Sequence, residues 1–153
     1  SLLTGRCPER AASSGVDTAL TFDQQGRIPK GETTIAQLLK SKGYHTALIG
    51  KWHLGHQEVD AVPAAYGFDH FYGHHGGLID YFEHKWQDRP DWWRNDKQIK
   101  EEGYSTDLLS DEAIRWIKEH KDGPFFCYLP YNAPHYAQRP VRGKNNILQA
   151  KDE

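Results

Sequence analysis

Two short apolar segments constrain the fold of this chain more than any other feature of its sequence. Residues 45–49 (HTALI) and 124–129 (PFFCYL) each have the length and composition of a buried strand. Each follows a segment with apolar residues at helical spacing, over residues 34–42 and 105–121. A helix followed by a buried strand, twice, predicts an α/β fold with a mainly parallel central sheet covered by helices on both faces.

The predicted helices have recognisable starts. In the first, Thr33 or Thr34 is placed to cap the helix through its hydroxyl, and Ile35, Leu38 and Leu39 form one apolar stripe. In the second, Ser105 or Thr106 takes the capping position. Its stripe consists of Leu109, Ala113, Trp116 and Ile117. We expect both stripes to face the sheet.

Charged and polar side chains follow the two strands directly. Lys51 and His53 come after the first strand, and His135 comes after the second. Ligands of parallel α/β sheets bind beyond the carboxyl ends of the strands. If the two strands are parallel and close together, the three side chains meet at one edge of the sheet. This placement is the central prediction from the pattern alone.

The chemistry of Lys51 and His53 suits an anion. Lysine brings a point charge with three donors, histidine adds a directed donor, and the flanking Gly50 and Gly55 allow close backbone approach. The spacing alone also fits a surface turn with a solvated lysine and a packed Trp52. His135 alone equally fits a packing or hydrogen-bonding role.

Composition narrows the class of protein. With 153 residues, 37% hydrophobic and 26% charged, the chain can form one globular domain with a hydrophobic core. The net charge of −2 gives no basic field for nucleic acid, and no apolar run is long enough to span a membrane. Residues 56–104 lack strong periodicity and carry many glycines and aromatic residues, which predicts a long functional loop region.

The sequence resembles the sulfatases, members of the alkaline phosphatase superfamily. Residues 43–55 (GYHTALIGKWHLG) are similar almost residue for residue to the second signature of that family. Residues 124–135, which end in YNAPH, resemble a later family segment, and residues 66–82 and 103–114 also fit. The resemblance implies that residues 1–153 are an internal part of an alkaline-phosphatase-like catalytic domain of the formylglycine-dependent, arylsulfatase-like enzymes.

The resemblance also assigns roles. It implies that Lys51 and His53 bind the sulfate, and that His135 contacts the sulfate and can protonate the leaving oxygen. His53 and His135 are thus the expected catalytic residues in this chain. The implied reaction of the intact parent is hydrolysis of a sulfuric ester of an aryl or carbohydrate compound.

Essential parts of a sulfatase site are expected outside this chain. The family's formylglycine arises from the Cys or Ser of a Cys/Ser-x-Pro-x-Arg motif, and residues 1–6 (SLLTGR) match only the tail that follows it. The nucleophile is therefore expected upstream of residue 1, and Cys7 is interpreted as an ordinary residue. The calcium expected for the intact enzyme has no assigned ligands here, so the chain alone is expected to be inactive.

Several alternatives remain open at this point. Asp80 and His84 are possible substrate-pocket residues or brace their loop, and Trp86, Trp92 and Trp93 form a stacking wall or pack the loop region onto the domain. His74 and His75 read as loop histidines near a pocket rim. The parent could instead hydrolyse phosphate or phosphonate esters, or bind sulfated glycans without catalysis. Export to the periplasm, the cell exterior or lysosomes is expected by resemblance only, and the oligomeric state is open.

Overall fold

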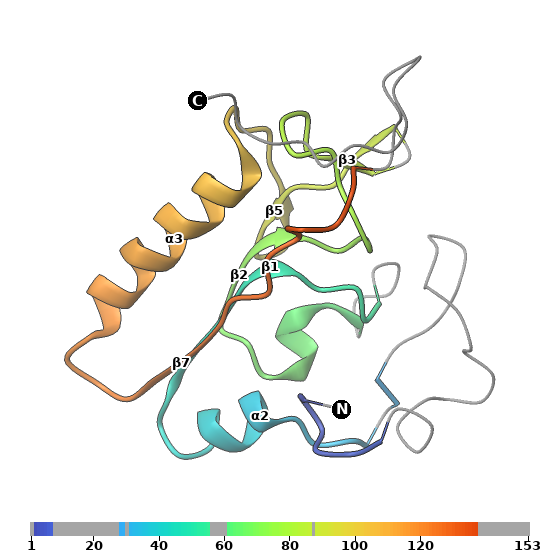
Figure 1. Cartoon of the computed structure of the whole chain (residues 1–153). Coiled ribbons are helices and arrows are strands. Elements are labelled where there is room, and N and C mark those ends of the chain that lie inside the picture. Colours follow the sequence, from blue (N-terminus) through green and yellow to red (C-terminus); the bar gives the residue numbers. More distant parts are fainter. Residues whose placement is uncertain (1, 8–27, 30, 56–60, 87, 138–153) are drawn as a thin grey trace.

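The computed structural model describes residues 2–7, 28–29, 31–55, 61–86 and 88–137 (Figure 1). The expected domain bounds, 1 and 153, lie outside these residues. The elements follow in the order α2 (Ile35–Lys40), β1 (His45–Lys51), the 3₁₀ helix η2 (Pro63–Tyr66), β2 (His70–His74), β3 (Lys85–Trp86), β4 (Arg89–Pro90), β5 (Trp93–Arg94), β6 (Lys97–Gln98), α3 (Ser105–His120) and β7 (Phe125–Tyr128).

The central sheet has the strand order β6-β5-β2-β1-β7. Strand β1 lies in the middle and pairs in parallel with both β2 and β7. Strand β5 pairs antiparallel with β2 and with the edge strand β6, and β3 and β4 form a separate two-stranded ribbon. The prediction of an α/β fold built on parallel strands is therefore confirmed, with an antiparallel edge that the sequence did not indicate.

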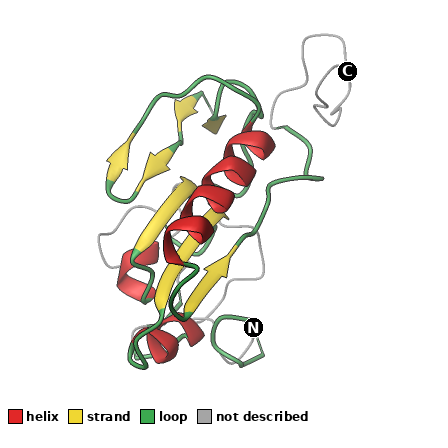
Figure 2. Ribbon diagram, turned by 90° about the vertical axis from the view of Figure 1, so that its left-hand side faces the viewer, coloured by secondary structure: helices red, strands yellow, loops and turns green. Residues whose placement is uncertain are grey.

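The two faces of the sheet carry separate apolar clusters, because successive side chains of a strand point to opposite faces. Ala47 and Ile49 of β1 and Tyr72 of β2 pack with Leu109 and Trp116 of α3. On the other face, the cluster combines residues of β1 and β2 with α2, η2 and their neighbours: Ala36, Leu48, Trp52, Tyr66, Phe68 and Phe71. Figure 2 shows α3 lying across the first face, so the layers are helix, sheet and helix.

The first helix begins as predicted but packs differently. Thr34 is its N-cap: Gln37 N–H donates to Thr34 Oγ1 at 3.1 Å, and Thr34 N–H donates to the Gln37 side chain at 2.9 Å. This reciprocal pair is a capping box. The predicted stripe is wrong for this short helix, because Ile35 and Leu38 are 39% and 57% exposed and Ala36 is the buried residue.

The long helix α3 packs on the sheet largely as predicted, with Leu109, Ala113 and Trp116 buried. Its start differs from the prediction: Tyr104 is the N-cap and Ser105 is already helical, so neither predicted hydroxyl acts as an N-cap. Ile117 is 36% exposed, at the margin of the packed stripe. None of the described helices is long and apolar enough to cross a bilayer.

Strand β2 is the main element that the sequence pattern did not predict. It lies in the region predicted as a long loop, and four of its five residues are buried. Phe71 and Tyr72 face opposite apolar clusters, so the strand shows no alternation of apolar and polar residues. Its two ends are the polar residues His70 and His74, so it also lacks the continuous apolar run that indicates a buried strand.

Glycines allow the carboxyl ends of β1, β2 and β7 to approach closely. A Cβ on Gly73 would lie 2.1 Å from the Gly50 carbonyl oxygen, and a Cβ on Gly50 would lie 2.1 Å from the carbonyl oxygen of Pro130. Both glycines have positive φ, of 133° for Gly50 and 143° for Gly73. A side chain at either position would therefore combine backbone strain with a main-chain clash.

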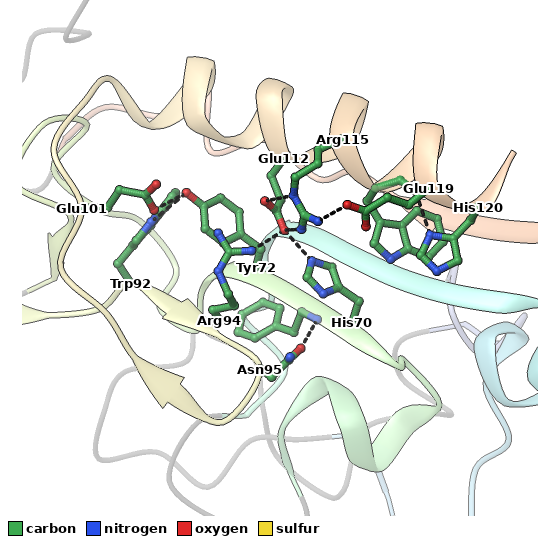
Figure 3. A network of polar contacts seen from close by, with 12 residues as sticks. His70, Tyr72, Trp92, Arg94, Asn95, Glu101, Glu112, Arg115, Glu119 and His120 are labelled. Carbon is green, nitrogen blue, oxygen red and sulfur yellow. Dashed lines mark hydrogen bonds and ion pairs between the residues drawn. The ribbon is translucent and has the colours of Figure 1, made fainter.

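An ion-pair network fixes α3 to the sheet (Figure 3). Glu112, which is 6% exposed, accepts hydrogen bonds from His70 Nε2 of β2 at 2.8 Å and Arg94 Nη1 of β5 at 2.5 Å. Arg115 of the same helix donates to both carboxylate oxygens. Burial alone would raise the pKa of Glu112, but the hydrogen bonds from His70, Arg115 and Arg94 outweigh it and hold the pKa well below its ordinary 4.5.

We predict that Glu112→Gln lowers the free energy of unfolding by about 2–3 kcal/mol at pH 7, because it leaves two arginines without their buried partner. The pKa of Glu112 is lower in the folded than in the unfolded chain, so its stabilisation is complete above the ordinary 4.5 and is lost as the pH falls below it. The difference between wild type and variant should therefore shrink from pH 7 to pH values below 4.5.

Urea unfolding of both proteins across this pH range measures the effect. Glu119→Gln is the matched control, because Glu119 lies on the same helix and also pairs with Arg115, at 2.6 Å, but is half-exposed. This control should change stability by less than about 0.5 kcal/mol. Equal losses for the two variants would show that the buried network does not hold α3 on the sheet.

Candidate functional site

The candidate site lies beyond the carboxyl ends of three parallel strands. Lys51 is the last residue of β1, His74 is the last residue of β2, and the segment after β7 leads to His135. Backbone hydrogen bonds join these exits: Lys51 N–H donates to the Pro130 carbonyl at 2.8 Å, and Trp52 N–H donates to the His74 carbonyl at 2.9 Å. The three strand exits therefore lie together at one edge, and the meeting of the Lys51, His53 and His135 side chains there stays a prediction.

Lys51 is half-buried and lies beside histidines. It is the register partner of His74 in the parallel β1–β2 pair, so the two side chains leave the same face of the sheet. Burial lowers the pKa of Lys51. Within the part of the chain that the structure describes, Lys51 Nζ forms no ion pair with a carboxylate. An incoming anion stabilises a partly desolvated cation that has no counter-ion.

His53 is held by its backbone and by a glycine. Its N–H donates to the His75 carbonyl at 3.0 Å, and its φ is 51°, in the left-handed region. A Cβ on Gly77 would lie 2.6 Å from His53 Nε2, so the imidazole lies directly against the bare backbone of Gly77. The motif at residues 50–55 indicated His53 as a site residue but not Gly77.

His135 is positioned by contacts of its backbone. Its N–H donates to the Asn132 carbonyl at 2.9 Å, and its carbonyl accepts from the buried Tyr81 hydroxyl at 2.6 Å. The imidazole is partly exposed, and its Nδ1 lies 3.1 Å from the Tyr136 carbonyl. Tyr81 thus ties the segment after β7 to the loop region, a link that no sequence pattern revealed.

The other proposed pocket residues make contacts that brace their loop. Asp80 Oδ1 accepts from the backbone N–H groups of Phe82 and Glu83 at 2.9 and 2.7 Å. His84 is buried, bonds the Gly103 carbonyl through Nε2 at 3.1 Å and stacks on Trp92 at 4.4 Å. These contacts match the bracing alternative, and a role in substrate binding stays a prediction.

Aromatic residues of the loop region pack inward. Trp86 and Trp92 are buried in the cluster beneath α3, while Trp93 is half-buried. His74 and His75 are also buried, and His74 is the last residue of β2, so it is not the loop histidine that the sequence suggested. The first two tryptophans therefore fold the loop region onto the domain instead of forming an open stacking wall.

Among the described residues, no group of three or more His, Cys, Asp or Glu side chains is arranged to hold a metal ion. The resemblance to the sulfatases implies a divalent metal together with formylglycine, and the described side chains show no such cluster for a metal. What they form is a cationic and imidazole-rich edge suited to an oxyanion.

Comparison with known proteins agrees with this edge. The family model described as Sulfatase matches residues 1–151. The chain belongs to the sulfatase family. The resemblance found in residues 43–55 and 124–135 is thereby confirmed.

Individual relatives support the same assignment. The chain is 36% identical to an N-acetylglucosamine-6-O-sulfatase of Bacteroides thetaiotaomicron over 92% of its length, and covers 22% of that protein. It is 32% identical to the human N-acetylgalactosamine-6-sulfatase over 93% of its length, and covers 31% of that protein. The chain thus spans less than a third of either relative.

A solved structure shows the same fold. The structure of Ps i-CgsB in complex with k-i-k-neocarrahexaose has a TM-score of 0.78 to this chain and 32% sequence identity. The match covers 92% of this chain and 35% of the other. The sequence predicted membership of the sulfatase family and an alkaline-phosphatase-like fold. Both predictions are confirmed.

We predict that Gly77→Ala displaces the His53 imidazole while costing less than about 1 kcal/mol of stability, because the flexible ring can move and the backbone need not. NMR of the histidine side chains, compared with wild type, measures the displacement. Gly123→Ala is the matched control, since a Cβ there meets nothing within 4 Å. Unchanged His53 resonances in Gly77→Ala would contradict the packing described above.

Proposed function

We propose that residues 1–153 form part of the catalytic domain of a longer protein that hydrolyses sulfate esters of carbohydrates. The observation that carries this proposal is Lys51, a half-buried cation at the end of the central strand with no carboxylate partner among the described residues. Such a cation is suited to an oxyanion, and the family membership makes a sulfuryl group the fitting one.

Each of the three site residues has a role that follows from its chemistry. Lys51 and His53 would hold the non-bridging oxygens of the sulfuryl group and stabilise the charge that develops there. His135, whose imidazole is partly exposed, would contact the sulfate and give a proton to the departing oxygen. A neutral alcohol would then leave instead of an alkoxide.

The remaining parts of the site would come from outside this chain. The family's formylglycine supplies the nucleophile, and we propose that its Cys or Ser precursor precedes residue 1. Calcium is the metal that we expect, held by ligands beyond the described residues. By the same family resemblance we propose that the longer protein is exported.

We propose carbohydrate sulfates as substrates, with aryl sulfates as the second class that the family offers. Two relatives are named for sulfated amino sugars, and a solved relative binds a neocarrahexaose. No observation on this chain favours phosphate esters or binding without catalysis.

We predict that the full-length protein hydrolyses a 6-O-sulfated N-acetylhexosamine, and an aryl sulfate more weakly, at rates far above those of the matched phosphate esters. Release of sulfate and phosphate from paired substrates at equal concentration measures this preference. Faster cleavage of the phosphate esters, by several orders of magnitude, would refute the sulfatase proposal. Binding of the sulfated sugar without turnover would favour a glycan-binding protein.

We predict that Lys51→Ala and His135→Ala each lower kcat/KM of the full-length enzyme by about 100-fold or more, since each removes a group that acts in the transition state. The loss for His135→Ala should be larger for a sugar sulfate than for an activated aryl sulfate, whose leaving group needs no proton. Steady-state kinetics on both substrates separates the two roles.

Matched controls exist at the far side of the fold. Lys118→Ala changes an exposed lysine of α3, and His45→Ala changes an exposed histidine at the opposite end of β1 from the site. Both controls should keep near-normal kcat/KM. Near-normal rates for Lys51→Ala and His135→Ala as well would place the site elsewhere.

A further inference from the structure

A buried histidine beside Lys51 has no assigned role. His74 is the last residue of β2, is 0% exposed and is the register partner of Lys51. Register partners in parallel strands project from the same face of the sheet, so the imidazole and the lysine side chain are neighbours at the edge where the sulfate would bind.

The protonation of the His74 ring follows from its hydrogen bond. His74 Nδ1 lies 3.0 Å from the Gly76 carbonyl oxygen, which can only accept, so Nδ1 carries the hydrogen. In the neutral ring, Nε2 then presents a lone pair. Nε2 is buried and has no hydrogen-bond partner within the described part of the chain. The ring is held nearly parallel to Trp92, with an interplanar angle of 11° and 6.5 Å between centroids.

The ring remains neutral at ordinary pH. Burial, and next the charge of Lys51, lower the pKa of His74 to about 3. A neutral ring with its only hydrogen directed at Gly76 cannot donate to a sulfate oxygen, so it is not an anion ligand itself. It can accept one hydrogen bond, and its register partner Lys51 brings an ammonium donor on the same face.

We propose that His74 is a positioning residue for Lys51: Nε2, which has no partner in the part of the chain that the structure describes, accepts one hydrogen bond from the lysine ammonium when the oxyanion binds. That bond directs the other N–H groups of the ammonium to the oxyanion. This inference rests on the proposed function of the site. It assigns His74 a role that acts only through Lys51, without contact to the substrate.

A neutral acceptor suits this task better than a carboxylate would. An Asp or Glu beside Lys51 would orient the ammonium equally well, but it would also neutralise the charge and repel the incoming sulfate. The imidazole takes up one of the three donors and leaves the charge available. Without such a bond, the Nε2 lone pair stays a buried acceptor with no partner among the described residues.

A double-mutant cycle in the full-length enzyme tests this role, with inorganic sulfate as a competitive inhibitor of sulfate-ester hydrolysis. His74→Leu should weaken inhibition by inorganic sulfate about 10-fold when Lys51 is present, and by less than about 2-fold in a Lys51→Met background. The KM for the ester should move in parallel, and thermal unfolding of each variant reports any purely structural effect. Equal effects of His74→Leu in both backgrounds would overturn the proposal.

Two further variants distinguish the effect of a neutral hydrogen-bond acceptor at position 74 from the effect of a negative charge there. His74→Gln keeps a neutral acceptor and should bind sulfate more tightly than His74→Leu, whereas His74→Glu should bind it more weakly than His74→Gln. If His74→Leu does not fold, this Gln and Glu comparison decides alone, and equal sulfate affinity for the two would overturn the proposal. His120→Leu, at the end of α3, is the control for losing an imidazole and should leave inhibition by sulfate unchanged.

The outcomes also separate this inference from the proposed function. A wild-type enzyme that neither hydrolyses sulfate esters nor binds inorganic sulfate would refute the proposed function, and the role of His74 with it. An active wild type with additive effects of His74 and Lys51 would refute only the role of His74.

Discussion

The candidate site depends on the position of β1 between two parallel partners. Lys51 and His53 leave the carboxyl end of β1, and the exits of β2 and β7 lie on either side. The approach of these exits is possible because Gly50 and Gly73 have no side chains where the neighbouring main chains pass. Backbone contact, not side-chain attraction, therefore sets the spacing of the site.

The same sheet keeps its buried charges at two separate ends. Glu112 is satisfied by Arg94, Arg115 and His70, at the amino end of β2. His74 lies four residues along, roughly 13 Å for an extended strand. The buried carboxylate thus stabilises the helix on the sheet without supplying a counter-ion to Lys51. A sheet of this kind can carry a structural ion network and an anion site without one cancelling the other.

The elements that could be predicted were those whose own residues indicate that they are buried. Continuous apolar runs marked β1 and β7, and the residues after them marked the edge where Lys51, His53 and His135 follow the strands. Strand β2 could not be predicted, because Phe71 and Tyr72 face different clusters and its ends are histidines with tertiary partners. Ile35 and Leu38 also have helical spacing, but in the short helix α2 they are exposed and do not form a packed stripe.

Within the site, sequence identified the groups that carry charge but not those that hold them. Lys51 and His53 belong to a recognisable motif, whereas Gly77 matters only because the His53 ring lies against it, and Tyr81 only because its hydroxyl reaches the His135 carbonyl. His74 and Lys51 are 23 positions apart in the sequence and become neighbours only through strand register. A cation that binds an anionic ligand must be oriented without losing its charge to a counter-ion. A buried neutral imidazole satisfies both conditions, which gives a physical reason for a histidine at the end of β2.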